Sequence, residues 1–215
     1  MLVYGGHNNF EDMTYEVGPA PTYDRLKWLD VKFKLGLEFP NLPYLINHSN
    51  DLRITEFHAI YRYLGRELKI GSSDSQGRAY EEMIGDIFKD FVWPMGKIVC
   101  YSPNFESQKT GFIQQFPDLV LRPLEKWLKG DRTPRKWLGG KDLCYADFLL
   151  FEFIEQTSKL CGEMYEKFPE LTRFYKAFKV LEPLQNYFKN AVLNILSTIR
   201  WHHSSSNIFI NFFYY

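Results

Sequence analysis

The chain has 215 residues, of which 45% are hydrophobic and 24% are charged, and this composition excludes wholesale disorder. Lys plus Arg and Asp plus Glu each number 26, so the formal net charge is zero and a basic nucleic-acid-binding protein is not expected. No uncharged apolar stretch approaches the ~20 residues of a membrane-spanning helix, and the opening residues lack the features of a signal peptide. The three cysteines form no CxxC pair, which favours reduced thiols in a cytoplasmic protein over a disulfide scaffold or a zinc ribbon.

The opening segment predicts a strand followed by a short helix. Residues 10–17 alternate partly between apolar and polar side chains, as a strand does. The sequence GPAP at 18–21 then breaks the chain. Residues 24–33 have helical spacing, with Asp24 near the start.

A hairpin and a second helix are expected next. The sequence NHSND at 47–51 has the composition of a turn and lies between two apolar runs, so residues 43–55 predict a β-hairpin. Thr55 is placed to cap a helix that runs from Glu56 to about Leu68. The Gly/Ser-rich residues 71–75 are the best linker candidate in the chain.

Beyond this linker the apolar pattern predicts helices. Apolar side chains recur at spacings of one, three and four over residues 83–99, where Pro94 should introduce a kink. Residues 145–161 are apolar on nearly every side, which predicts a helix buried in an all-α core. Three more helices are expected, at 117–128, 169–180 and 182–190.

The predicted organisation has three parts. An α/β unit spans residues 1–70, an all-α unit spans 75–200, and an atypical tail occupies 201–215. The tail is rich in aromatic side chains and has no Asp, Glu, Lys or Arg, and it is too short to span a bilayer. No membrane partner is therefore expected.

Common catalytic and metal-binding patterns are absent from the sequence. His202 and His203 are adjacent and would chelate poorly, and His58 has no second ligand at helical spacing, so no metal site is expected. The sequence contains no GxSxG, P-loop or GxGxxG motif, which leaves hydrolase, NTPase and Rossmann functions without support.

The informative segment is WLDVKFKLGLEFPNLPYLI, at residues 28–46. Leu42–Pro43 at the entry to a strand is a place where a cis peptide would let an extended ligand pair with the backbone. Trp28 offers an indole N–H and Lys32 a cation for a carboxylate, while Glu56 offers a carboxylate to an ammonium group. A ligand with a carboxylate, a peptide and an ammonium group in a row would fit, and glutathione has this layout.

The same segment resembles the mu class of cytosolic glutathione transferases, as does ITEFHAIYRYL at 54–64. GPAP at 18–21 together with RYLGRE at 62–67 is most similar to the mu-class enzymes of mites. The resemblance continues through VCYSPNFE at 99–106 and DLCYADFLLFE at 142–152. It implies an α/β thioredoxin-like N-terminal domain followed by an all-α domain, the glutathione transferase fold, in a cytoplasmic homodimer.

The resemblance also implies roles for individual residues. Trp28 and Lys32 would hold the glycine carboxylate of glutathione, and the Arg25 side chain could approach the same end. Asn41 would lie beside the peptide, and Leu42 before a cis Pro43 would pair with the cysteinyl backbone.

Four further positions complete this implied set. Glu56 stands where the class usually has Gln, at the γ-glutamyl end, and Phe57 stands where it has Ser or Thr beside the γ-glutamyl carboxylate. Tyr101 matches the hydroxyl residue over the electrophile pocket, and Phe39 matches the aromatic residue that enters the partner subunit. No cofactor is implied, because glutathione is a co-substrate.

The sequence also departs from the family pattern. No segment matches the GYWDIRG-like opening strand that carries the catalytic tyrosine, so no catalytic residue is assigned. Residues 10–17 would lack their usual neighbouring strand, and Cys144 stands where Ser or Thr should cap a helix, a loss that costs about 0.5–2 kcal/mol. Three hypotheses stay open: a transferase acting on hydrophobic electrophiles, a non-catalytic homologue that binds glutathione or an apolar ligand, and an incomplete gene model of an active enzyme.

Overall fold

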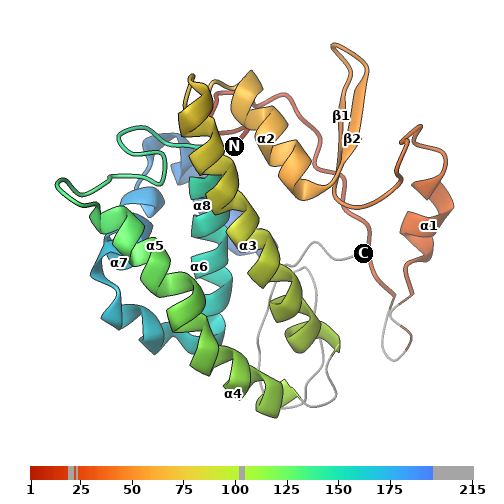
Figure 1. Ribbon diagram of the computed structural model, residues 1–215. Helices are drawn as coiled ribbons and strands as arrows, with labels where there is room; N and C mark the ends of the chain where they lie inside the picture. Colours follow the sequence, from red (N-terminus) through yellow and green to blue (C-terminus); the bar gives the residue numbers. More distant parts are fainter. Residues whose placement is uncertain (19–21, 23, 102–104, 196–215) are drawn as a thin grey trace.

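The computed structural model describes residues 1–18, 22, 24–101 and 105–195, with the side chains of 92–101, 105–106, 159–161 and 191–195 outside that description. A helix and a two-stranded sheet precede a set of packed helices (Figure 1). The elements are α1 Leu26–Lys32, β1 Tyr44–Asn47, β2 Leu52–Thr55, α2 Phe57–Glu67, α3 Ser75–Tyr101, α4 Phe105–Phe116, α5 Arg122–Lys129, α6 Tyr145–Cys161, α7 Pro169–Lys179 and α8 Gln185–Ile195.

The core is built around α6, as its apolar sequence predicts. Helix α3 packs along α6, and α5 packs against α7 (Figure 1). Leu150 of α6 is fully buried, and Phe153 lies with its ring 5.5 Å from that of Phe88 on α3. Helices α2, α3 and α7 therefore all pack on the same central helix.

The start of α6 corrects one expectation. Cys144 does not leave the helix without a cap, because it forms a reciprocal capping box with Asp147. The buried Asp147 carboxylate accepts the N–H groups of Cys144 and Leu138, each at 2.7 Å. Burial raises the pKa of Asp147 to about 7, and the two N–H donors oppose that shift. Burial also raises the pKa of the Cys144 thiol well above its ordinary value, so this thiol is not an activated nucleophile.

Three helices meet at Tyr145, the first residue of α6. Its hydroxyl group donates to the Glu81 carbonyl of α3 at 3.2 Å. A Cβ at Gly85 of α3 would lie 2.6 Å from the Tyr145 Oη, and a Cβ at Gly65 of α2 would lie 3.4 Å from the Tyr145 Cβ. The two glycines therefore let α2 and α3 approach the tyrosine closely.

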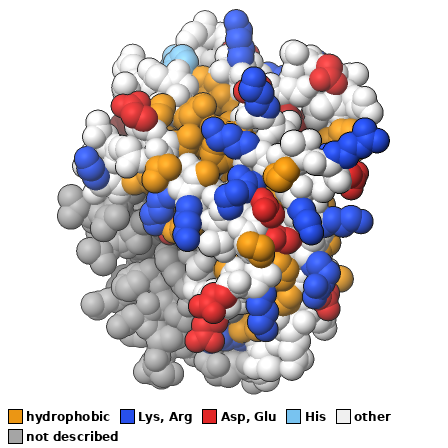
Figure 2. Space-filling model, turned by 90° about the vertical axis from the view of Figure 1, so that its left-hand side faces the viewer, with side chains coloured by type: hydrophobic (Ala, Val, Ile, Leu, Met, Phe, Trp, Pro, Cys, Tyr) orange, Lys and Arg blue, Asp and Glu red, His pale blue; other side chains and the backbone are white. Residues whose placement is uncertain are grey.

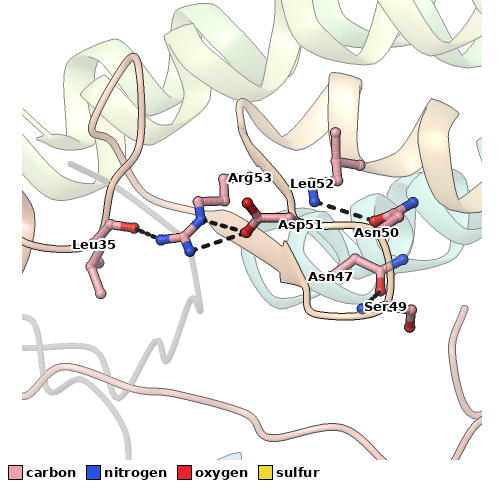
Figure 3. A network of polar contacts seen from close by, with 7 residues as sticks. All are labelled: Leu35, Asn47, Ser49, Asn50, Asp51, Leu52 and Arg53. Carbon is pink, nitrogen blue, oxygen red and sulfur yellow. Dashed lines mark hydrogen bonds and ion pairs between the residues drawn. The ribbon is translucent and has the colours of Figure 1, made fainter.

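The hairpin is confirmed, with β1 and β2 antiparallel and Tyr44 opposite Thr55. Asn side chains shape its turn: Asn47 Oδ1 accepts the Ser49 N–H at 3.0 Å and Asn50 Oδ1 accepts the Leu52 N–H at 3.2 Å (Figure 3).

Arg53 ties this hairpin to the loop after α1. Its Nη1 donates to the Leu35 carbonyl at 2.7 Å, and its Nη2 to Asp51 Oδ1 at 3.1 Å (Figure 3). Gly36 in that loop has φ +66, and a Cβ there would lie 2.7 Å from Arg53 Nη1, so the close approach favours glycine.

Three predictions of local structure are wrong. Residues 10–17 form no strand, because the described chain brings no second strand alongside them to pair with their backbone. Thr55 does not cap α2, because it is the last residue of β2 and its Oγ1 donates to the Phe39 carbonyl at 2.9 Å. Glu56 occupies the N-cap position and makes no side-chain capping hydrogen bond. The helix expected to start at Pro117 instead continues from α4 through a π-helical turn at Pro117–Leu121.

The other expected helices are present. Asp24 lies at the start of α1, where its Oδ1 accepts the Leu26 N–H at 3.2 Å. Helix α3 runs through Pro94 as one element, and α7 and α8 match the two helices expected after 169. The break at 18–21 and the tail at 201–215 lie wholly or mostly outside the described residues, and the division into units 1–70 and 75–200 stays a prediction.

Charged side chains are interleaved on the face over α5 and α7. Many Lys and Arg side chains gather there among hydrophobic ones (Figure 2). Arg122, Arg173 and Lys179 each pair with an acidic side chain, at 2.7, 2.7 and 3.0 Å. Within the described residues no helix is long and apolar enough to cross a membrane, and no group of His, Cys, Asp and Glu is arranged to hold a metal ion.

Candidate functional site

The segment that leads into β1 contains a cis peptide bond between Leu42 and Pro43, as the sequence predicts. Asn41, just before it, donates from Nδ2 to Glu56 Oε1 at 3.3 Å. The hydrogen bond from Thr55 to the Phe39 carbonyl adds a second link. Loop 39–43 is therefore held against the junction of β2 and α2, where the predicted site residues Asn41 and Glu56 are in contact.

Glu56 has an unusual backbone conformation. Its φ is +71 and its ψ is 113, a region that residues other than glycine rarely adopt. The side chain is exposed and contacts Asn41. The strained backbone places a carboxylate at the rim of the loop, where it is available to a ligand.

Trp28 is the buried residue of α1, only 4% exposed. Its ring is stacked on that of Tyr44 in β1, with centroids 6.1 Å apart, and it lies 5.3 Å from that of Tyr15. The hydroxyl groups of Tyr15 and Tyr44 are hydrogen-bonded at 2.7 Å. These three residues, here called the aromatic cluster, join α1, the 10–17 segment and the strand after the cis peptide.

Two cations flank Trp28 along α1. Arg25 is the residue before α1, three positions ahead of Trp28. Lys32 is the last residue of α1, four positions after Trp28, and so lies on the same side of the helix. Arg25 is exposed and Lys32 half-buried, with the Lys32 Nζ 5.4 Å from the Phe33 ring centroid. Among the described residues neither has an acidic partner, so this side of α1 can attract a carboxylate.

The remaining predicted residues lie on other elements. Phe57, the first residue of α2, is half-buried, and its ring centroid is 4.0 Å from that of His58. Phe39 is 81% exposed. Tyr101 ends α3, and its side chain lies outside the described part of the chain.

The described contacts therefore bring the predicted residues together in two groups. Asn41, Leu42, Pro43 and Glu56 form one group, and Arg25, Trp28 and Lys32 form the other, and stacking of Trp28 on Tyr44 connects them. Sequence reasoning missed Tyr15 and Tyr44. The position of Tyr44 directly after Pro43 was a usable signal, because a residue there must lie beside loop 39–43.

Comparisons with known proteins identify the family. The model described as "Glutathione S-transferase, C-terminal domain" matches residues 89–191. The chain is 34% identical over 183 residues to "Glutathione S-transferase Mu 1" of Bos taurus, covering 85% of this chain and 80% of the relative. It is 36% identical over 189 residues to "Glutathione S-transferase B" of Cavia porcellus, covering 86% and 82%.

The chain belongs to the mu class of glutathione S-transferases. Solved structures agree: the glutathione S-transferase Blo t 8 superposes with a TM-score of 0.77 at 29% identity, covering 87% of this chain and 84% of that one. A Pi-class glutathione S-transferase of Onchocerca volvulus has a TM-score of 0.75 at 22% identity, covering 90% and 86%, and supports the fold alone. The glutathione transferase fold predicted from the sequence is confirmed.

Two substitutions at Glu56 should distinguish the effect of its backbone conformation on stability from the effect of its side chain. Both Glu56→Gly and Glu56→Ala remove the contact with Asn41, but only glycine relieves the positive φ. We expect Glu56→Gly to have a free energy of unfolding about 1 kcal/mol higher than Glu56→Ala, measured by urea unfolding and tryptophan fluorescence. Equal stability of the two variants would contradict the strain assigned to this residue.

Proposed function

We propose that this mu-class chain binds glutathione across α1, loop 39–43 and the start of α2, and conjugates it to hydrophobic electrophiles. The observation that carries the proposal is the pairing of Asn41 with Glu56 beside the cis Leu42–Pro43 peptide. The curated relatives, which this chain matches over 80% or more of their length, are glutathione S-transferases. This match supports the same activity.

The glycine end of glutathione fits the side of α1 that carries Arg25, Trp28 and Lys32. Two cations without acidic partners among the described residues attract its carboxylate, and charge-assisted hydrogen bonds to such groups are stronger than neutral ones. The aromatic cluster holds Trp28 against β1, so the helix is fixed before the ligand arrives. Preorganisation of this kind lowers the entropy lost on binding.

The other end of glutathione fits loop 39–43 and α2. The backbone of Leu42 offers its N–H and C=O to the cysteinyl residue, and the Glu56 carboxylate accepts from the γ-glutamyl ammonium group. Phe57 would lie beside the γ-glutamyl carboxylate, where its ring narrows the space for the ligand. A Ser or Thr at this position would instead donate a hydrogen bond to that carboxylate.

The chemistry requires a thiolate. The sulfur attacks an electrophilic carbon, a carbon–sulfur bond forms, the leaving group departs with its electron pair, and the thiol proton goes to solvent. A free thiol has a pKa of about 8.5, so a donor that favours the charged form accelerates the reaction. In the family that the sequence resembles, a tyrosine donates this hydrogen bond to the sulfur. None of the 215 residues matches that tyrosine.

Binding is tested by removing one cation. Lys32→Met should weaken glutathione binding about tenfold or more in calorimetric titration, because a charge-assisted contact is lost. Lys34→Met is the matched control, since Lys34 is exposed just beyond the end of α1. An equal effect of the two substitutions would contradict the place given to the carboxylate.

Transfer is tested with 1-chloro-2,4-dinitrobenzene. We expect the 215-residue chain to turn over ~10²–10³-fold more slowly than a mu-class enzyme that carries this tyrosine, because one oriented donor to an anion contributes about that factor. Fusion of a family-like opening segment with its tyrosine should restore much of the rate, and the same fusion with Phe for that Tyr should not. Full activity of the unfused chain would mean that another group activates the thiol, and Tyr101→Phe would then test the first candidate.

A homodimer is part of the proposal, with Phe39 inserted into the second copy. Phe39→Ala should shift the protein toward monomer in sedimentation at micromolar concentration, because Phe39 is the only large exposed ring in loop 39–43. Phe33→Ala is the control, since Phe33 on the neighbouring stretch of chain is similarly exposed, at 77%. A wild-type dimer that Phe39→Ala leaves intact would remove Phe39 from this role. Cytoplasmic location belongs to the same proposal, since it rests on the family.

A further inference from the structure

His58 is a buried ionisable group that the proposed binding chemistry does not use. It is the second residue of α2 and only 6% exposed. Within the described residues neither ring nitrogen has a hydrogen-bond partner. The nearest acidic atom is Asp86 Oδ1 on α3, 4.0 Å from Nδ1, beyond hydrogen-bond distance.

The charged groups around His58 come from both helices. Arg62 lies one turn along α2, and Asp86, Lys89 and Asp90 face it from α3. Asp86 already accepts a hydrogen bond from Arg62 Nη2 at 2.6 Å. A proton on His58 would therefore compete with Arg62 for a carboxylate that is in use.

This environment favours the neutral ring. Burial is the main cause, and with Arg62 and Lys89 it lowers the pKa of His58 from 6.5 to about 4, against the opposing effect of Asp86 and Asp90. The histidine is thus uncharged at neutral pH when α2 packs on α3. When the turn opens to water, its pKa returns toward the ordinary value.

The first turn of α2 also carries part of the proposed glutathione site. The His58 ring packs on Phe57, with centroids 4.0 Å apart, and Glu56 precedes Phe57 directly. These three residues belong to one turn, so opening of that turn away from α3 moves the two residues placed at the γ-glutamyl end.

We propose that His58 is a positioning residue whose uncharged ring holds the first turn of α2 against α3, so that acid opens this turn and glutathione closes it. The role of the ligand rests on the proposed function, whereas the opening concerns the free protein.

The direction in which pH changes the opening of the first turn of α2 follows from proton linkage. Between pH 6.5 and about 4 the open turn binds more protons than the closed turn, so the opening equilibrium constant rises as pH falls. Below about pH 4 both states are protonated and the effect is complete. With these two pKa values, the opening constant increases about 30-fold from about pH 7.5 to about pH 5.

Amide hydrogen exchange on the free full-length chain tests the opening, with protection factors corrected for the intrinsic rate. When the pH is lowered from about 7.5 to about 5, the protection factors over residues 57–64 should fall about 30-fold more in the wild type than in His58→Leu. The protection factors of α7 should change equally in both proteins. His48→Leu is the matched control, because His48 is exposed in the hairpin turn, and it should behave as wild type. Burial raises the pKa of Asp147, and its protonation affects the wild type and the variants alike, so it cancels in the comparison.

His58→Phe serves as a second variant if His58→Leu does not fold, since it keeps a ring and cannot titrate. An equal loss of protection in the wild type and in the folded non-titrating variant would overturn the role of His58. A loss that is equal in α2 and α7 would also overturn it, because the acid effect would then be global unfolding.

A second arm adds glutathione at a concentration that saturates the wild type at about pH 7.5. Bound glutathione should slow exchange over residues 57–64 at about pH 5, since ligand and proton act on one equilibrium in opposite directions. Binding without such slowing would overturn the link between His58 and the site. If glutathione does not bind at about pH 7.5, the proposed function has failed, and the exchange of the free chain alone confirms or overturns the opening.

Discussion

The structure depends on the hydrogen bonds that the buried Asp147 carboxylate accepts. They fix the start of α6 and the preceding loop, and each would cost about 1–3 kcal/mol if its N–H were left buried without a partner. Because α6 is the helix on which α3 packs, an error at its start would propagate to its surroundings. A carboxylate serves here better than the neighbouring thiol, since sulfur is a weak acceptor.

The candidate site depends on this core less directly. Helix α1 and the hairpin are joined to each other by the aromatic cluster and by Arg53, and α2 connects them to α3 and α6. Residues that would contact the ligand thus belong to elements with few buried apolar neighbours. Such elements open at lower free energy than a core helix. A low opening free energy suits a binding surface, and it also lets protonation of a buried group such as His58 change how often the surface opens.

The sequence predicts some elements well because several signals agree. The predicted range of α6 matches the observed one, since the apolar run begins and ends where the helix does, although the cap at Cys144 was expected to be lost. Turn composition predicts the hairpin, and the family resemblance implies the cis Leu42–Pro43 peptide. The 28–46 motif indicates the same family as the curated relatives do, because it carries most of the residues that the family resemblance places around glutathione.

Other features could not be predicted for physical reasons. Alternation at 10–17 describes side-chain faces, but a strand also needs a neighbour's N–H and C=O groups. Thr55 has the right side chain for a cap, but its hydroxyl is engaged by the Phe39 carbonyl. Helix α4 was missed because its polar run includes Gly111, which weakens the apolar period. The distance from His58 to Asp86 is a property of packing between two helices, which spacing along the chain does not contain.

The meeting of three helices at Tyr145 has an evolutionary consequence. A Cβ at Gly85 would clash with the Tyr145 hydroxyl group, whereas a Cβ at Gly65 would touch the Ile70 carbonyl at 3.3 Å and the Tyr145 Cβ at 3.4 Å. A residue larger than glycine at 85 therefore needs a smaller or displaced ring, and a residue larger than alanine at 65 meets the same tyrosine. A smaller residue at 145 would in turn leave a void that a side chain at 65 or 85 could fill. Among relatives, these three positions should therefore change together, although they are far apart along the chain.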